Sequence, residues 1–232
     1  MLPNDSDNRG GPAPEAIVTG DLHIGCRYFM AGKFAGFMDS LAPDTALILN
    51  GDVVDRRHTP LQETHRKVLD RIKAESEQRE VIWIRGNHDE VYVMDDLARI
   101  RFAPCHNLGK RLFIAHGAHF DNVLPYNRPF VLAFRAFHRL RILLGADSVH
   151  VAFYAKKWMP LYRVLRRSVA LNAVEYAREN GYEAVTCGHT HYPEETVIKG
   201  VKYFNTGAWT EEPVSYLAVY PDHMQLEQLP RT

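Results

Sequence analysis

Residues 45–55 read TALILNGDVVD, an apolar run that stops at a glycine and an aspartate. Such a run, bounded by Pro43 on one side and by Gly51-Asp52 on the other, predicts a buried strand with Asp52 at its carboxyl end. The same arrangement, an apolar run followed by a short polar motif, recurs in AIVTGDLHIG (16–25), EVIWIRGNHDE (80–90), RLFIAHG (111–117) and EAVTCGHTH (183–191). The sequence therefore predicts five strands that each deliver polar side chains where they end.

Helical patterns separate the first three of these strands. Residues 34–41 have helical spacing, and Thr59-Pro60-Leu61-Gln62 predicts the capped start of a helix of about 18 residues that ends near Gln78. Apolar strands that alternate with helices predict an α/β layered fold in which both faces of the sheet are covered. Residues 195–207 and 215–229 alternate in hydropathy, and we expect them to form paired strands that close a second sheet.

The composition is that of an ordinary folded domain. Of the 232 residues, 46% are hydrophobic and 24% are charged, and the formal net charge is zero. The three cysteines are too few for a disulfide framework and indicate a reducing compartment. The first 15 residues lack the pattern of a secretory signal, and the sequence has no apolar run of about 18 residues. We therefore expect a cytoplasmic protein with a flexible tail at residues 1–14 and one domain at residues 15–232.

The polar motifs carry side chains that bind divalent metals. Carboxylates, imidazoles and amide oxygens are metal ligands, and mixtures of histidine and aspartate suit manganese, iron or zinc. Seven residues of the motifs are candidate ligands: Asp21, His23, Asp52, Asn87, His116, His189 and His191. Sites in α/β folds gather at the carboxyl ends of the strands, so we expect these side chains to converge.

The candidate ligands divide into two sets that share one carboxylate. A carboxylate that follows a strand and a glycine, as Asp52 does, can bridge two cations about 3.5–4 Å apart. The two sets are Asp21, His23, Asp52 and His191 for one cation, and Asp52, Asn87, His116 and His189 for the other. In an extended backbone, residues two apart point the same way, which would bring Asp21 and His23 to one ion. The competing interpretation, ordinary turn residues, fits single motifs better than five in succession.

GDLHIG, NGDVVD, GNHDE, AHG and GHTH resemble, in this order, the five signature motifs of the calcineurin-like metallophosphoesterase superfamily. The resemblance implies a four-layer α/β/β/α sandwich and a phosphoester hydrolase with two divalent cations; manganese is favoured, with iron or zinc as alternatives. It also implies that His88 contacts the scissile phosphate, where it stabilises the transition state or protonates the leaving oxygen, and that Asp89 orients its imidazole. Asp55 is expected either to support a metal ligand or to be an ordinary acid at a helix entry.

Residues 125–170 differ from the rest of the chain. They hold nine basic residues and one acid, a net charge of +8. Helical spacing separates an apolar face from a basic face. The apolar face carries Phe130, Phe134, Phe137, Leu140 and Leu144, and the basic face carries Arg128, Arg135 and Arg139. A second helical stretch begins near Val149 and is interrupted or restarted at Pro160. We therefore expect a helical insertion with a basic and aromatic surface.

Three roles are open for this insertion. A basic helix with an apolar face can contact an anionic membrane surface, form a pocket for acyl chains, or simply pack on the core. Nucleic acid is disfavoured as a partner, because large aliphatic side chains are interleaved with the basic ones.

The chain length and the insertion after AHG make the sequence similar to the UDP-2,3-diacylglucosamine hydrolase family, in which the corresponding insertion covers the acyl chains. The best-known branch of that family has arginine at the position of His88, and the family tends to have an acid where this chain has Ala118. The similarity implies cleavage of the diphosphate of UDP-2,3-diacylglucosamine, or of a similar lipid-linked nucleotide, at the cytoplasmic face of the inner membrane. Candidate substrate-binding residues are Arg56, His119, Arg128, Arg135 and Arg139.

Two other functions remain open. The same chemistry fits a soluble phosphodiesterase or phosphoprotein phosphatase with a different substrate. A non-catalytic scaffold is disfavoured, because a scaffold has no need of the eight converging polar side chains in the motifs. We expect the histidines that lie far from the motifs in the sequence to be surface residues or hydrogen-bonded residues. His138 and His150 are two of these histidines.

Overall fold

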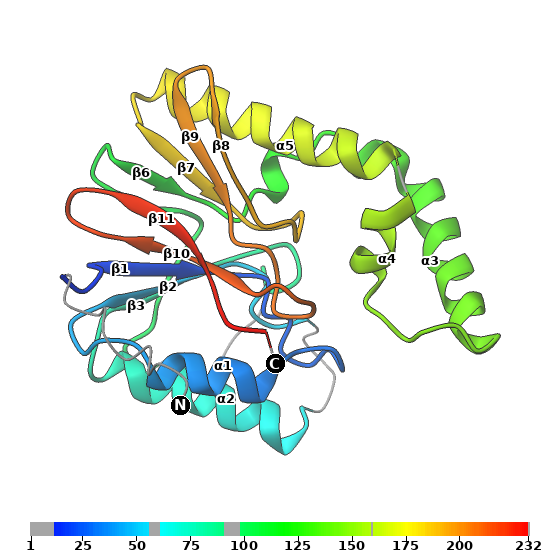
Figure 1. Ribbon diagram of the computed structural model, residues 1–232, viewed down its shortest axis with the longest axis horizontal. Helices are drawn as coiled ribbons and strands as arrows, with labels where there is room; N and C mark the ends of the chain where they lie inside the picture. Colours follow the sequence, from blue (N-terminus) through cyan, green and yellow to red (C-terminus); the bar gives the residue numbers. More distant parts are fainter. Residues whose placement is uncertain (1–11, 56–60, 91–97, 159, 232) are drawn as a thin grey trace, which may run out of the picture.

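The computed structural model describes residues 12–231 except 56–60, 91–97 and 159, and the described part forms two β-sheets enclosed by helices (Figure 1). The first sheet has the strand order β11 (Met224–Gln228), β10 (Ser215–Val219), β1 (Ala16–Thr19), β2 (Ala46–Asn50), β3 (Val81–Ile84) and β4 (Arg101–Ala103). Strands β1 to β4 pair in parallel, whereas β10 pairs antiparallel with both β1 and β11. The expected tail lies outside the described residues up to residue 11, and residues 12–14 have no regular secondary structure.

The second sheet has the order β5 (His106–Leu108), β6 (Leu112–Ile114), β7 (Ala184–Cys187), β9 (Val201–Asn205) and β8 (Glu194–Ile198). Its three inner strands, β6, β7 and β9, are parallel, and the two edge strands are antiparallel to their neighbours. The inner strands β6 and β7 are fully buried, because both faces of the sheet are covered.

Helices complete the layers on the two outer faces. Helices α1 (Ala31–Asp39) and α2 (Glu63–Ser76) cover the first sheet, and α5 (Pro160–Glu179) covers the second (Figure 1). A separate apolar cluster fills each interface between layers. The cluster between the first sheet and its helices includes Phe34, Ile72 and Trp83. The cluster between the two sheets includes Ile48, Ile114 and Phe204, and the cluster between the second sheet and α5 includes Val169, Ala173 and Tyr203. The predicted four-layer α/β/β/α sandwich is therefore confirmed.

Some expected elements differ from those observed. Residues 215–229 were expected in the second sheet, but β10 pairs with β1 through Ala16 and Val219, because it covers the edge of the first sheet that the parallel strands leave open. The three-residue strands β4 and β5 escape prediction, since RFA and HNL are too short to show a period. Helix α2 begins only at Glu63, and the predicted cap at residues 59–60 lies outside the described residues.

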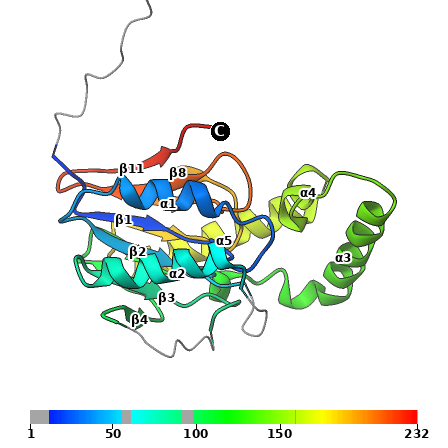
Figure 2. The same cartoon turned by 90° about the horizontal axis from the view of Figure 1, so that it is seen from below.

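Between β6 and β7 the chain forms the expected helices. After the short 3-10 helices Ala118–Phe120 and Pro125–Asn127 come α3 (Arg128–Leu143) and α4 (Val151–Trp158), which project beyond the sheets (Figures 1 and 2). Helix α5 begins beside them and continues over the second sheet, so an insertion boundary at residue 170 falls inside one helix. None of the helices that the structure describes is long and apolar enough to cross a membrane.

A buried ion-pair network joins the end of α2 to the start of β2. Glu75 is only 3% exposed and accepts hydrogen bonds from Arg71 Nε at 2.7 Å and from Arg79 Nε at 2.6 Å. The Arg79 guanidinium also donates to the carbonyl oxygens of Ala42 and Thr45. The Glu75 carboxylate therefore balances a buried cation that fixes a helix against the central sheet.

The substitution Glu75→Gln should lower the free energy of unfolding by about 3 kcal/mol, because the buried Arg79 guanidinium loses its counter-ion. Urea unfolding followed by circular dichroism measures the effect. Glu63→Gln on the same helix is the matched control, since Glu63 and its partner Lys67 are 73% and 72% exposed, and it should leave the midpoint almost unchanged. Equal effects of the two substitutions would contradict the importance of the buried network.

Candidate metal centre

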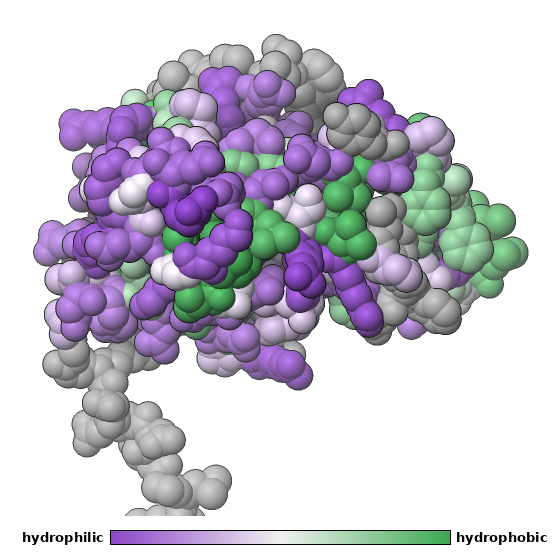
Figure 3. Space-filling view, turned by 90° about the horizontal axis from the view of Figure 1, so that it is seen from above, coloured by the Kyte–Doolittle hydropathy of each residue, from purple (hydrophilic) through white to green (hydrophobic). Residues whose placement is uncertain are grey.

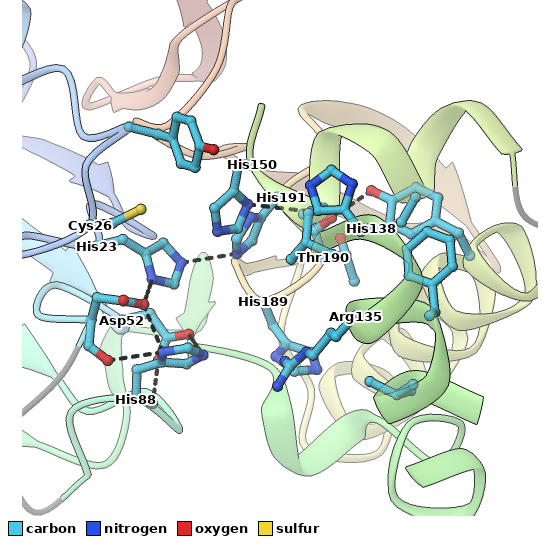
Figure 4. A pocket seen from close by; sticks show the side chains of 18 of the residues that line it. His23, Cys26, Asp52, His88, Arg135, His138, His150, His189, Thr190 and His191 are labelled. Carbon is cyan, nitrogen blue, oxygen red and sulfur yellow. Dashed lines mark hydrogen bonds and ion pairs between the residues drawn. The ribbon is translucent and has the colours of Figure 1, made fainter. Parts of the chain in front are cut away.

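The ends of β1, β2, β3, β6 and β7 bring the polar motifs together at one edge of the two sheets. Figure 4 shows part of this group, with His23, Asp52, His88, His189 and His191 near one another. Within the part of the chain that the structure describes, three overlapping groups of side chains have ligand atoms within 4.8 Å of one another: Asp21, His23 and His191; His23, Asp52 and His88; and Asp21, Asp52 and His116. Asp21 and Asp52 are almost completely buried, at 0% and 2% exposure. Side chains from all five motifs thus form one continuous cluster.

The polar atoms of the first ligand set face one another at short distances. His191 Nε2 lies 3.2 Å from Asp21 Oδ1 and 3.1 Å from His23 Nε2. Two imidazole nitrogens at this distance cannot both be acceptors without repulsion, and a cation between their lone pairs removes the conflict. The donor set Asp21, His23 and His191 therefore fits a divalent metal.

The second set surrounds the amide oxygen of Asn87. This oxygen lies 3.3 Å from His116 Nε2 and 3.0 Å from His189 Nδ1, and His116 Nε2 is also 3.3 Å from Asp52 Oδ2. The other carboxylate oxygen of Asp52 accepts the backbone N–H of His88 at 2.8 Å. Asn87, His116, His189 and Asp52 therefore lie close enough together to offer oxygen and nitrogen atoms to a second cation.

Three of the four ligand imidazoles have an acceptor for the nitrogen that faces away from the cluster, whereas His191 Nδ1 is buried without a hydrogen-bond partner among the described residues. His116 Nδ1 donates to the Asn50 carbonyl oxygen at 3.1 Å, and His23 Nδ1 lies 3.0 Å from Asp55 Oδ1. His189 Nε2 lies 2.9 Å from Asp121 Oδ2. These partners favour the tautomers in which the unprotonated nitrogen points into the cluster.

Asp121 is a supporting residue that the sequence reasoning missed. Besides His189, its carboxylate accepts the backbone N–H groups of Val123 and Leu124 at 2.7 and 3.0 Å, so its position is fixed. The only signal in the sequence is an acid four residues after Gly117. An acid at that distance is not recognisable without the turn that brings it back to the histidine.

Asp55, and not Asp89, orients the imidazole of His88. His88 Nδ1 lies 3.0 Å from Asp55 Oδ1, whereas the Asp89 carboxylate accepts hydrogen bonds from Gly86 N, Val53 N and Trp83 Nε1 at 2.7, 2.8 and 3.0 Å. The prediction for Asp89 was therefore wrong, because donors from β3 and from the segments after β2 and β3 occupy its oxygens. Asp55 supports both His23 and His88.

Charges within the cluster stabilise one another. Burial alone raises the pKa of the Asp52 carboxyl, but the imidazoles of His116 and His88 outweigh burial and lower it. Burial lowers the pKa of the His116 imidazole, but Asp52 and Asp21 outweigh this effect and raise it to about 10. Burial also lowers the pKa of His88, and its hydrogen bond to Asp55 together with the charge of Asp52 raises it to about 9. The buried carboxylates therefore require positive charge beside them.

The backbone at the ligands is not extended. Asp21, His23, Asp52, His189 and His191 have φ between 50° and 63°, in the left-handed region. The prediction placed Asp21 and His23 on one side of an extended strand, and this reason was wrong. Both side chains nevertheless lie in the first ligand set. Left-handed residues turn the chain sharply at the strand end, and this turn brings both side chains inward.

The candidate substrate-binding residues have different positions. Arg135 and Arg139 line a cavity next to the cluster, with Arg135 on the α3 side in Figure 4. Arg128 and His119 are exposed and are not among the residues lining that cavity. Arg56 lies outside the described residues. His138 and His150, expected at the surface or hydrogen-bonded, both line the cavity.

Comparison with known proteins identifies the family of this arrangement. The model of the family described as calcineurin-like phosphoesterase matches residues 16–193, which include all five motifs. No match was found among curated proteins.

Among solved structures, the chain is similar to several proteins at low sequence identity. Vacuolar Protein Sorting 29 from Cryptosporidium parvum is 12% identical, with 92% of this chain and 95% of that chain covered and a TM-score of 0.45. Yfce, a phosphoesterase from E. coli, is 17% identical, with 92% and 97% covered and a TM-score of 0.46. Phosphopantetheinyl hydrolase from Mycobacterium tuberculosis is 15% identical, with 94% and 96% covered and a TM-score of 0.43.

The substitution Gly86→Ala should abolish metal binding, because a Cβ there collides with the carboxylate and the backbone nitrogen of Asp52. Elemental analysis after incubation with manganese measures the bound metal. The control is Gly36→Ala in α1, where a Cβ meets nothing within 4 Å; this protein should bind metal normally and be more stable by about 0.5–1 kcal/mol. A folded Gly86→Ala protein with a full metal content would contradict the role of this close approach.

Proposed function

The chain belongs to the calcineurin-like phosphoesterase family, and from this premise we propose that it cleaves the diphosphate of UDP-2,3-diacylglucosamine or of a similar lipid-linked nucleotide. Membership of the family makes it a metal-dependent phosphoesterase, with a divalent metal centre and a phosphorylated substrate. The lipid-linked part of the proposal depends on the residues beside that centre.

One observation carries the proposal: a single cavity of about 460 Å³ joins the metal-ligand cluster to an apolar wall. At one end it is lined by His23, Asp52, His88, His189 and His191. At the other end it is lined by apolar residues from all three helices of the insertion, namely Val131, Phe134 and Ile142 of α3, Val151 and Ala155 of α4, and Leu165 of α5. A substrate with a phosphate group and an aliphatic part matches both ends at once.

The chain's own residues supply distinct parts of the chemistry. Asp21, His23, Asp52, Asn87, His116, His189 and His191 are the residues that would hold the cations, among which we favour manganese. Bound divalent cations supply Lewis-acid charge that polarises a phosphoryl group and activates water. His88 is fixed through Nδ1 by Asp55, which leaves Nε2 to stabilise or protonate the leaving oxygen.

Two arginines on α3 suit the second phosphate of a diphosphate. Arg135 and Arg139 line the same cavity and offer guanidinium groups that can bind phosphate oxygens bidentately. They add positive charge to the lining of the cavity that the ligand cluster and the apolar wall share.

The outer face of α3 supports contact with an anionic membrane, as at the cytoplasmic face of an inner membrane. Large apolar side chains are exposed along this face and at its end: Phe130, Leu132, Phe137, Leu140, Leu143 and Leu144. Apolar surface is visible at the end of the molecule where α3 lies in Figure 3. Residues 125–170 also carry a net charge of +8, so lipid burial and attraction to anionic headgroups act together.

The manganese-loaded protein should hydrolyse UDP-2,3-diacylglucosamine and, more slowly, bis-p-nitrophenyl phosphate. Val131→Asp places a carboxylate on the apolar wall and should lower turnover of the lipid nucleotide by more than about tenfold, because burying a charge beside acyl chains is costly. It should leave bis-p-nitrophenyl phosphate turnover within about twofold, since that ester needs only the metal centre. Turnover of both substrates is measured side by side.

Ala133→Asp, an exposed position on the same helix, is the matched control and should change neither rate. His88→Ala should lower both rates while the metal content stays normal, which assigns the hydrolysis to this site. Equal loss of both substrates in Val131→Asp, or no turnover of the lipid nucleotide by the wild type, would favour a soluble phosphodiesterase or phosphoprotein phosphatase.

Membrane contact is tested by cosedimentation with vesicles of phosphatidylethanolamine and phosphatidylglycerol. The double substitution Leu143→Asp and Leu144→Asp removes side chains that are 82% and 78% exposed, and should weaken vesicle binding by at least about tenfold. Val197→Asp, on an exposed apolar residue of β8, is the control and should bind like wild type. Wild-type protein that stays in the supernatant at low salt would rule out this membrane contact.

A further inference from the structure

His150 brings a helix of the insertion to the metal-ligand cluster. It immediately precedes α4, and its ring centroid lies 5.6 Å from that of His191 and 5.8 Å from that of His23. Figure 4 shows its imidazole beside those two rings, and it lines the cavity that contains His88. His150 belongs to none of the five motifs, and nothing in the sequence assigns it to the site.

One hydrogen bond selects which ring nitrogen carries the proton. The backbone N–H of Ala152 donates to His150 Nδ1 at 3.3 Å, as a side chain does at the start of a helix. An accepting Nδ1 requires that the proton of a neutral imidazole be on Nε2. Among the described residues, His150 Nε2 has no hydrogen-bond acceptor, although the ring lies at the edge of a polar cavity. A donor is therefore available to a ligand in the cavity.

The position of His150 is fixed from both sides. The preceding residues are held by hydrogen bonds from His138 Nε2 to the Val149 carbonyl oxygen at 3.0 Å, and between the hydroxyls of Ser148 and Tyr28 at 2.8 Å. Farther along α4, Lys156 donates to the His191 carbonyl oxygen and pairs with Glu211. The imidazole is thus presented to the cluster by a segment that is bonded to α3, to the loop after β1 and to the loop after β7.

We propose that His150 is a substrate-contacting residue whose Nε2–H donates a hydrogen bond to a phosphoryl oxygen of the substrate. His23 is the neighbour of both His88, at 4.9 Å, and His150, so a phosphate at the cluster lies within reach of two imidazoles carried by different parts of the chain. The inference rests on the proposed phosphoester hydrolysis and deepens it: the insertion contributes a donor to the reacting group in addition to an apolar wall.

Two other roles make different demands on the ring. A metal ligand would need an unprotonated Nε2, which moves the proton to Nδ1 and breaks the bond from Ala152. A purely structural role would need only the acceptor at Nδ1, which holds the start of α4. Substitution by glutamine or asparagine distinguishes these roles. The amide of glutamine reaches the position of Nε2, whereas the amide of asparagine reaches the position of Nδ1.

The experiment compares His150→Gln with His150→Asn in the full-length, manganese-loaded protein. We expect His150→Asn to keep the helix start and the metal, but to lower kcat for bis-p-nitrophenyl phosphate by about 10- to 100-fold, as loss of a donor to a charged phosphoryl oxygen does. His150→Gln should retain kcat within about threefold. Calorimetric titration with inorganic phosphate should show about tenfold weaker binding for His150→Asn and nearly unchanged binding for His150→Gln.

Each alternative has its own result. Loss of one metal equivalent in both variants, measured by elemental analysis, would make His150 a ligand and overturn the proposal. Full kcat and phosphate binding in His150→Asn with losses in His150→Gln would make it a structural residue and also overturn it. If the wild type hydrolyses no phosphoester, the proposed function fails, and the phosphate titration still decides whether His150 contacts a phosphoryl group.

Discussion

Two buried carboxylates impose the arrangement of everything around them. Asp21 and Asp52 lie at the edge of the sheets with 0% and 2% exposure, and an uncompensated buried carboxylate is among the most costly groups a fold can contain. The imidazoles that converge on them supply the compensation, and bound cations supply more. The backbone at Gly188 and Gly86 also lies very close to these carboxylates. A Cβ at Gly188 would collide with the Asp21 carboxylate, and a Cβ at Gly86 would collide with that of Asp52. The glycines of the motifs are therefore part of the electrostatic arrangement.

The residues that carry this charge have an unusual backbone conformation. Five of the seven predicted ligands have left-handed φ values, which for residues other than glycine cost free energy at each position. The strands before them are hydrogen-bonded on both sides, and β2 pairs with β1 and with β3 along nearly its whole length. Such paired, fully buried strands hold their ends rigidly, so the strained turns persist and present their side chains in one arrangement. The layered core thus keeps the strained turns at the site in place.

Features of the site that depend on neighbouring residues in the sequence can be predicted, whereas features that depend on residues far apart in the sequence cannot. The strands before the motifs and the convergence of the motif side chains can be predicted from the sequence, because each apolar run stops at a motif and parallel strands end at a common edge. The sheet to which β10 and β11 belong is not readable, since hydropathy gives their period but not their neighbour. Asp121 and His150 are hidden for the same reason: their partners His189 and His191 are 68 and 41 residues away, and only the folded chain brings them together. Asp55 was distinguishable from Asp89 only by the geometry of the loop.

The insertion and the metal-ligand loops are mechanically coupled. Tyr162 at the start of α5 donates to the Thr190 carbonyl oxygen, and Lys156 of α4 donates to that of His191. Two helices are therefore bonded to the loop that carries His189 and His191. Helix α5 then continues onto the second sheet, whose strand β7 carries the same loop. A displacement of the insertion must therefore either break these bonds or move His191 relative to Asp21. The apolar wall of the cavity is for this reason not independent of the polar cluster that lines the same cavity.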